Sequence, residues 1–174
     1  FKVTIRRKNE GDDKMVELKV KKLKETAILP VKATDGSVCY DVFVSEDVIV
    51  LPRTACERAY LVPTGLQITP PKGYGLKVHL RSSTGRNTGL RLANQTGIID
   101  TDYQGEIFIC LENFSKLPEV IKAGDRVAQL EVIAIIDSKV TEVKETPKAT
   151  TRGKGGFGST GKTQIKTTTE GDGE

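Results

Sequence analysis

The sequence contains a single histidine, His79, no tryptophan and only 5% aromatic residues. One histidine excludes any metal site built on two histidines, and a Ser-His-Asp triad would have to use His79 itself. Because His79 follows the alternating run Leu76-Lys77-Val78, we interpret it as an ordinary strand residue. With so few aromatic rings, the core of this 174-residue chain must consist mainly of valine, isoleucine and leucine.

Cysteines, strong net charge and long apolar runs are also scarce. Cys39, Cys56 and Cys110 are spaced too widely for a metal knuckle, so we interpret them as reduced structural residues. A formal net charge of +4 permits an anionic ligand but does not by itself indicate nucleic acid, and we expect no direct nucleic-acid binding.

No apolar run approaches the length of a membrane span, and no secretory signal is recognisable. We therefore expect no membrane association and an intracellular location, in the cytoplasm or nucleus, or in the virion if the chain is viral. The only methionine is Met15, so we interpret residues 1–14 as an extension or a polyprotein junction.

Alternation of apolar and polar residues dominates the chain, and proline or glycine turn signals separate the alternating runs. No window of a dozen residues has the periodicity of a helix. Many short strands at close spacing predict an all-β fold, either a sandwich, a jelly roll or a barrel. The expected strands are Val16–Val20, Asp47–Leu51, Tyr74–Leu80, Glu106–Leu111 and Arg126–Ile136.

The composition changes near Pro147, because residues 146–174 hold seven glycines, many threonines and few large apolar residues. Such a segment cannot bury enough apolar surface to fold alone. We therefore expect an N-terminal extension with a strand in residues 1–21, a β core in residues 22–145 and a flexible C-terminal arm in residues 146–174.

The arm contains the run Gly156–Thr163, which matches the P-loop pattern letter for letter. A P-loop needs a buried strand before it and a helix after it, because the helix N-terminus helps to hold the phosphates. Neither neighbour fits here, so we reject a P-loop. Glycines and hydroxyls can still form a cradle of backbone amides for phosphate.

Four further segments carry polar chemistry. The first, Ala33–Val42, has Asp41 at the start of a strand, and the second, Leu80–Gly85, joins a guanidinium to hydroxyls at a strand end, a combination that suits phosphate oxygens. The third, Gly97–Glu106, has two aspartates, Asp100 and Asp102, and an asparagine, Asn94, upstream. The fourth, Gly124–Leu130, brings an amide into a strand. Each alone has an ordinary interpretation as a surface turn, a turn cap or an outward strand residue.

Together with the glycine-rich arm, these segments form an ordered set of five that resembles the trimeric dUTPase family over residues from about Lys22 to Gly161. The resemblance implies a distorted jelly-roll subunit and a homotrimer with exchanged C-terminal arms, in which all three chains build each active site. It also implies hydrolysis of dUTP to dUMP and pyrophosphate with Mg²⁺, which limits uracil incorporation into DNA.

The resemblance assigns a role to each segment. Asp100 matches the catalytic acid that would deprotonate the attacking water, with Asp102 as the rival. Tyr103 matches the ring that lies against the deoxyribose and excludes a 2′-hydroxyl. The uracil pocket matches Asn94 and the backbone of Gly97, Ile98, Ile99 and Asp100, because fixed partners reject a base with the wrong order of donors and acceptors.

The remaining matches concern the phosphates and the metal. Asp41 resembles the acid that holds Mg²⁺ through a water molecule. Phe157 resembles a ring that stacks on uracil. The expected phosphate contacts are Arg81, Ser82, Ser83 and Gln129 in the core, and Arg152, Gly158, Ser159 and Thr160 in the arm.

Three positions depart from the family pattern: Val38-Cys39 stands in place of Ala-Gly, Leu80 in place of proline, and Ser83 in place of glycine. None removes an expected catalytic group. Two alternatives stay open. One is a catalytically weak or silent dUTPase-like module that serves as a binding or structural domain, for example of a viral or retroelement polyprotein. The other is a dCTP deaminase, which shares the fold and an Arg-Ser-Ser motif.

Overall fold

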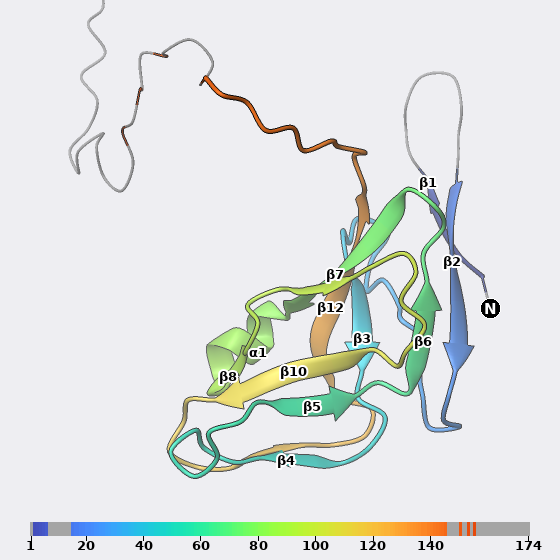
Figure 1. The fold of residues 1–174 in the computed structure, drawn as a ribbon. Coiled ribbons are helices and arrows are strands. Elements are labelled where there is room, and N and C mark those ends of the chain that lie inside the picture. The colour runs from blue at the N-terminus through green and yellow to red at the C-terminus, as the bar shows by residue number, and fades with distance from the viewer. Residues whose placement is uncertain (1, 7–14, 146–149, 151–152, 154, 156–174) are drawn as a thin grey trace, which may run out of the picture. The chain divides into compact units, whose positions relative to one another are not determined.

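The computed structural model describes residues 2–6, 15–145, 150, 153 and 155. Contacts divide the chain into two units, residues 1–137 and residues 138–174. The first unit carries all the regular secondary structure of the described residues, and Figure 1 shows how its strands are arranged. Within the described part, no helix is long and apolar enough to cross a membrane.

The first unit is built almost wholly from strands, as the alternating sequence predicts. Its elements are β1 (Lys2–Arg6), β2 (Met15–Lys22), β3 (Tyr40–Phe43), β4 (Val48–Val50), β5 (Tyr60–Pro63), β6 (Leu66–Thr69), β7 (Tyr74–Leu80), α1 (Ser82–Asn87), β8 (Leu90–Leu92), β9 (Gly97–Ile99), β10 (Phe108–Asn113), β11 (Glu119–Ile121) and β12 (Arg126–Ala134).

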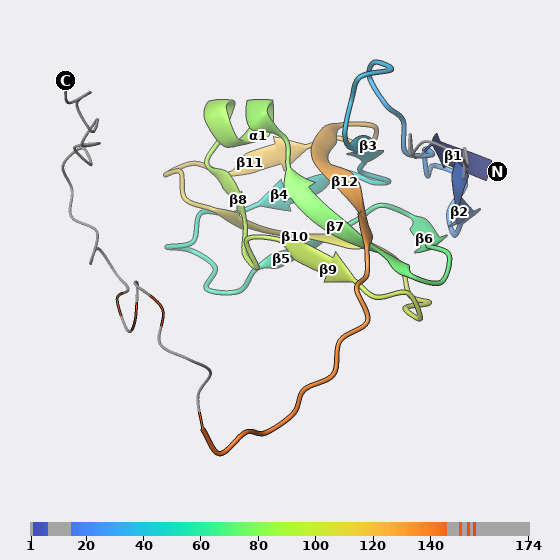
Figure 2. The ribbon, with the colours of Figure 1, turned by 90° about the horizontal axis from the view of Figure 1, so that it is seen from above.

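The strands form four small antiparallel sheets, in the orders β1-β2-β6, β5-β10-β8, β11-β4 and β3-β12-β7-β9. Most neighbours are far apart in sequence, as in a jelly roll, whose strands return by long connections. Figure 2 shows α1 beside β8 and β11 at one end of this unit. The all-β jelly-roll prediction is confirmed.

A single aliphatic core joins the sheets. The side chains of Leu66, Leu76, Ile109, Leu111 and Leu130 are all but completely buried in it. Tyr40 is the one aromatic residue among the buried apolar residues of the described part. The prediction of an aliphatic core is therefore correct.

The expected strands differ from the observed ones mainly at their ends. Tyr74–Leu80 is β7 itself and includes His79, as predicted. Glu106–Leu111 is shifted, because Glu106 turns its carboxylate to the backbone N–H of Gly65 (2.7 Å) instead of joining β10. The short helix α1 falls below the length at which helical periodicity can be recognised.

Candidate active site

A buried carboxylate that accepts hydrogen bonds from two arginines lies at one end of the four-stranded sheet. Asp41 in β3 is only 7% exposed, and its two oxygens accept hydrogen bonds from Arg81 Nε (2.9 Å) and Arg126 Nη1 (3.0 Å). Arg81 Nη1 also donates to the backbone oxygen of Arg126 (3.0 Å). Two guanidinium groups facing one carboxylate leave a net charge of +1, which favours an anionic ligand.

A cavity of about 260 Å³ opens beside this cluster. It brings together three of the segments that the sequence singled out, because Asp41, Arg81, Ser82 and Gln129 all line it. The register explains the meeting, since Gln129 in β12 pairs directly with Asp41 in β3 and with His79 in β7. We call the group Asp41, Arg81, Arg126, Ser82 and Gln129 the anion cradle, because Arg126 also binds Asp41.

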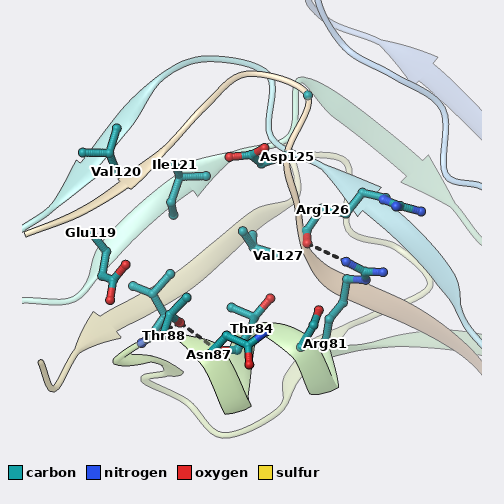
Figure 3. Close-up of a pocket in the computed structure, with 13 residues that line it drawn as sticks. Arg81, Thr84, Asn87, Thr88, Glu119, Val120, Ile121, Asp125, Arg126 and Val127 are labelled. Atoms are coloured by element: carbon teal, nitrogen blue, oxygen red, sulfur yellow. Dashed lines mark hydrogen bonds between the residues drawn. The ribbon is translucent and has the colours of Figure 1, made fainter.

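Ser83, also expected at the phosphates, lines a different hollow. This hollow, of about 490 Å³, lies between α1 and β11 and shares Arg81 and Arg126 with the cradle. Figure 3 shows Thr84 and Thr88 on one side of it, with Glu119 and Asp125 across from them. In one chain, therefore, Ser82 and Ser83 border separate cavities.

The third segment, Gly97–Glu106, runs along β7 from Val78 toward the start of that strand, away from Arg81. In β9, Gly97 pairs with Val78 and Ile99 with Leu76. A Cβ on Gly97 would lie 3.0 Å from Val78 Cβ, a contact so tight that Val78 or β9 would have to shift by a few tenths of an ångström. Asn94 Nδ2 lies 3.6 Å from the same position, an ordinary contact distance.

Asp100 follows β9 directly and lies exposed on a tight turn. Its backbone oxygen accepts from the N–H of Tyr103 (3.2 Å), and Thr101 Oγ1 donates to the backbone oxygen of Tyr74 (2.7 Å). The backbone of the turn is fixed while the carboxylate of Asp100 faces solvent. Asp102, the rival acid, is exposed on the same turn.

Tyr103 is folded back over the same turn. Its hydroxyl donates to the backbone oxygen of Glu106 (2.9 Å), and the side chain remains 41% exposed. Gly105 lies under the end of the ring, and a Cβ there would collide with the ring end. The turn thus presents a fixed ring beside a free carboxylate, a surface that can pack against a planar or sugar-like group.

The two groups of residues do not meet within one chain. Asp100 follows the residue paired with Leu76, whereas Arg81 follows the other end of β7. At about 3.3 Å per residue, the intervening strand separates them by roughly 15–20 Å. The arm residues Arg152, Phe157, Gly158, Ser159 and Thr160 lie outside the described residues.

The chain matches the dUTPase family model over residues 25–161. A deoxyuridine 5′-triphosphate nucleotidohydrolase of Hydrogenobaculum sp. is 41% identical to it over 146 residues, which is 84% of this chain and 99% of that protein. The rice protein of that name is 38% identical over 83% of this chain and 80% of its own length. The chain belongs to the dUTPase family.

A solved structure agrees with this assignment. The dUTPase of Staphylococcus bacteriophage 80alpha, determined with dUPNHPP, superposes with a TM-score of 0.72 at 26% identity. The superposition covers 83% of this chain and 98% of that one.

One departure from the dUTPase pattern, Leu80 in place of proline, has a simple structural explanation. The N–H of Arg81 donates to Val127 O (3.2 Å), so the alternate pair Leu80 and Ala128 is not hydrogen-bonded in this ladder. The residue at position 80 therefore donates no N–H to β12, so the position accepts either proline, which has no N–H, or leucine.

Cys39 lines the anion cavity, where burial and then the nearby Glu131 raise the pKa of its thiol. It therefore remains a protonated thiol, and all three cysteines are free, as predicted.

Arg126 is the residue of the cradle that the sequence analysis missed. Counting back from Gln129 by strand alternation places residue 126 on the opposite face of β12. The pairing of β12 with β3, however, shifts register between Arg126 and Ala128. Such a bulge re-aims a side chain, which allows Arg126 to reach Asp41. Two consecutive buried residues, Val127 and Ala128, mark the irregularity.

The described residues offer no cluster of three or more histidine, cysteine or acidic side chains that could enclose a metal ion. A carboxylate has about four acceptor positions, and only two of those on Asp41 are used by arginines. The remaining positions can accept from metal-bound water. The cradle therefore fits an ion held mainly by phosphate oxygens and water, which is the usual mode for magnesium.

Proposed function

We propose that the chain hydrolyses dUTP to dUMP and pyrophosphate. The observation that carries this proposal is the division of the polar residues into two complementary groups. One is a cationic cradle suited to a polyphosphate, and the other is a rigid turn with a free carboxylate and an exposed ring. Membership of the dUTPase family supports the proposal, because the relatives bear the name of this activity.

The turn supplies the base recognition and the chemistry in this proposal. Asp100 orients and deprotonates the water that attacks the α-phosphorus, since an exposed carboxylate on a fixed turn can hold a water within hydrogen-bond reach. Tyr103 packs against the deoxyribose and leaves no space for a 2′-hydroxyl. Asn94 and the backbone of Gly97, Ile98 and Ile99 bind uracil and leave the wrong base with unpaired groups.

The cradle binds the phosphates. Arg81 and Gln129 contact the triphosphate oxygens, and Ser82 donates near the α–β bridge, where negative charge develops as pyrophosphate leaves. Bound Mg²⁺ would neutralise phosphate charge, with Asp41 reaching it through water. The arm residues Arg152, Phe157, Gly158, Ser159 and Thr160 close over the nucleotide and shield it from other water. The expected site of action is intracellular, where DNA precursors are made.

Because the two groups lie at opposite ends of β7, we further propose that Asp100 of one chain acts on a nucleotide held by the cradle of another. A homotrimer with three such sites satisfies this requirement by symmetry. Ser83, which borders the second hollow rather than the cradle, keeps its assignment as a phosphate contact only if substrate binding brings that hollow and the cradle together.

The direct test is pyrophosphate release by the purified chain with magnesium. We expect release from dUTP and little from UTP, dTTP or dCTP. No release from dUTP at micromolar enzyme would favour the catalytically silent module. Ammonia released from dCTP would instead favour the deaminase.

A further inference from the structure

Asp41, Gln129 and His79 stand side by side on three neighbouring strands. Gln129 pairs with Asp41 on β3 and with His79 on β7. Directly opposed residues of antiparallel strands point to the same face of the sheet. Asp41 and Gln129 line the anion cavity on that face, so His79 lies next to Gln129 on the side away from Asp41.

Both neighbours of Gln129 are held in place. Asp41 is fixed by Arg81 and Arg126, as described above. His79 Nε2 lies 2.8 Å from Glu131 Oε2, and each of these two side chains is about one-third exposed. Glu131 follows Gln129 by two residues in β12, so it shares the same face. The contact between His79 and Glu131 therefore fixes the imidazole ring on the face of the sheet that also carries Gln129.

Gln129 itself has a weaker anchor. Its Nε2 donates to the backbone oxygen of Leu80 over 3.2 Å, at the long end of the normal range. A phosphate oxygen can only accept hydrogen bonds, so Gln129 binds it only with the second N–H of Nε2 directed into the cavity. A glutamine side chain loses many rotamers when it is fixed. Neighbouring side chains on both sides of Gln129 restrict these rotamers and so raise the fraction of molecules whose amide already points into the cavity.

We propose that His79, held by Glu131, is a positioning residue that keeps the amide of Gln129 directed into the anion cradle. The proposal rests on the proposed function, because it takes Gln129 to be a phosphate contact. It assigns a role to two residues, His79 and Glu131, that the expected dUTPase site does not include. Binding of the polyphosphate is the affected step, so we expect KM to change more than kcat.

The experiment compares the parent with His79→Ala and Glu131→Ala by steady-state kinetics on dUTP and by calorimetric titration with inorganic tripolyphosphate. Each variant should raise KM and the tripolyphosphate Kd about three- to tenfold, the cost expected when a rotamer-rich side chain must be immobilised on binding. kcat should stay within about twofold. Glu131→Gln keeps an acceptor for His79 and should restore most of the affinity.

The matched control is Glu46→Ala. Glu46 also has a side-chain partner at 2.8 Å, Lys24, but this pair is exposed and includes no residue of the cradle. Its removal should leave both constants unchanged. Melting temperatures measured for every variant separate a loss of affinity from a loss of fold.

The decisive comparison is made in a Gln129→Ala background. If His79 acts through Gln129, His79→Ala should have no further effect there, so the two changes should be strongly non-additive. A further loss of tripolyphosphate affinity would mean that His79 contacts the ligand itself, and the proposal would be wrong. Unchanged affinity in His79→Ala alone would also overturn it. Tripolyphosphate binding needs no turnover, so a parent that bound it without hydrolysing dUTP would refute the proposed function and not this one.

Discussion

Arg81 donates from Nε to Oδ1 of Asp41 over 2.9 Å and so ties the end of β7 to β3, across the intervening strand β12. The contact joins two of the segments that the sequence singled out. It also explains how a carboxylate that is only 7% exposed remains satisfied, since a buried charge is tolerated only when it is paired and hydrogen-bonded.

The first prediction concerns this contact. Asp41→Ala leaves the guanidinium groups of Arg81 and Arg126 facing one another without a carboxylate. Both arginines are partly exposed, at 25% and 44%, so water relieves some of the cost. We expect a loss of about 1–3 kcal/mol in the free energy of unfolding, below the cost of breaking a fully buried pair. Urea unfolding at one fixed protein concentration measures it.

Asp47→Ala is the control for that change. Asp47 pairs with Lys122 at the same kind of distance, 2.8 Å, but both side chains are more than half exposed. Exposed pairs contribute little to stability, because water screens the charges and both side chains must be held in place. Equal losses for Asp41→Ala and Asp47→Ala would show that the burial of Asp41 has no energetic consequence.

The strands could be predicted from local patterns in the sequence. That Asp41, Arg81, Ser82 and Gln129 act together could be predicted only from the family resemblance, and contacts that depend on strand register could not be predicted at all. The alternation of Tyr74–Leu80 directly gives β7, because a half-buried strand has a period of two. Arg126 escaped notice, because a bulge breaks that period where the residue must reach Asp41. The contact of His79 with Glu131 joins residues 52 positions apart and depends on the register of β7 with β12, which no local pattern encodes.

The second prediction concerns Asp100. Asp100→Asn keeps the size and the turn but cannot accept a proton, so kcat should fall by about 10²–10⁴-fold while KM stays within a few-fold. Pyrophosphate release and equilibrium binding of a non-hydrolysable dUTP analogue measure the two effects. Asp102→Asn, on the same exposed turn, is the control and should retain most of the activity. The reverse pattern would assign the role to Asp102.

The third prediction concerns the ring of Tyr103. A methyl group at Gly105 would occupy the space of the ring end and displace it. Because only a flexible side chain must move, stability should change little, but discrimination between dUTP and UTP should fall by about tenfold as space opens for a 2′-hydroxyl. The ratio of kcat/KM for the two nucleotides measures this. Gly36→Ala adds the same methyl in open space and controls for stability. Unchanged discrimination in Gly105→Ala would separate Tyr103 from sugar recognition.

The last prediction uses the distance between the cradle and the turn. Asp100→Asn disables the turn, and Ser82→Ala removes a donor from the cradle without touching the contacts of Asp41. The loss of one such donor typically costs about 10²–10³-fold in rate. If each site takes its turn from one chain and its cradle from another, randomly mixed trimers of the two variants should recover about one quarter of the parent activity, because each half is intact in half of the chains.

The control for this experiment is a mixture of either variant with the double variant Asp100→Asn/Ser82→Ala. That mixture never combines an intact turn with an intact cradle, so it should stay inactive. Native mass spectrometry confirms that mixed trimers form. If mixed trimers of the two single variants recover no activity, each chain completes its own site. Asp100 would then have to reach the cradle of its own chain, despite the length of β7 between them.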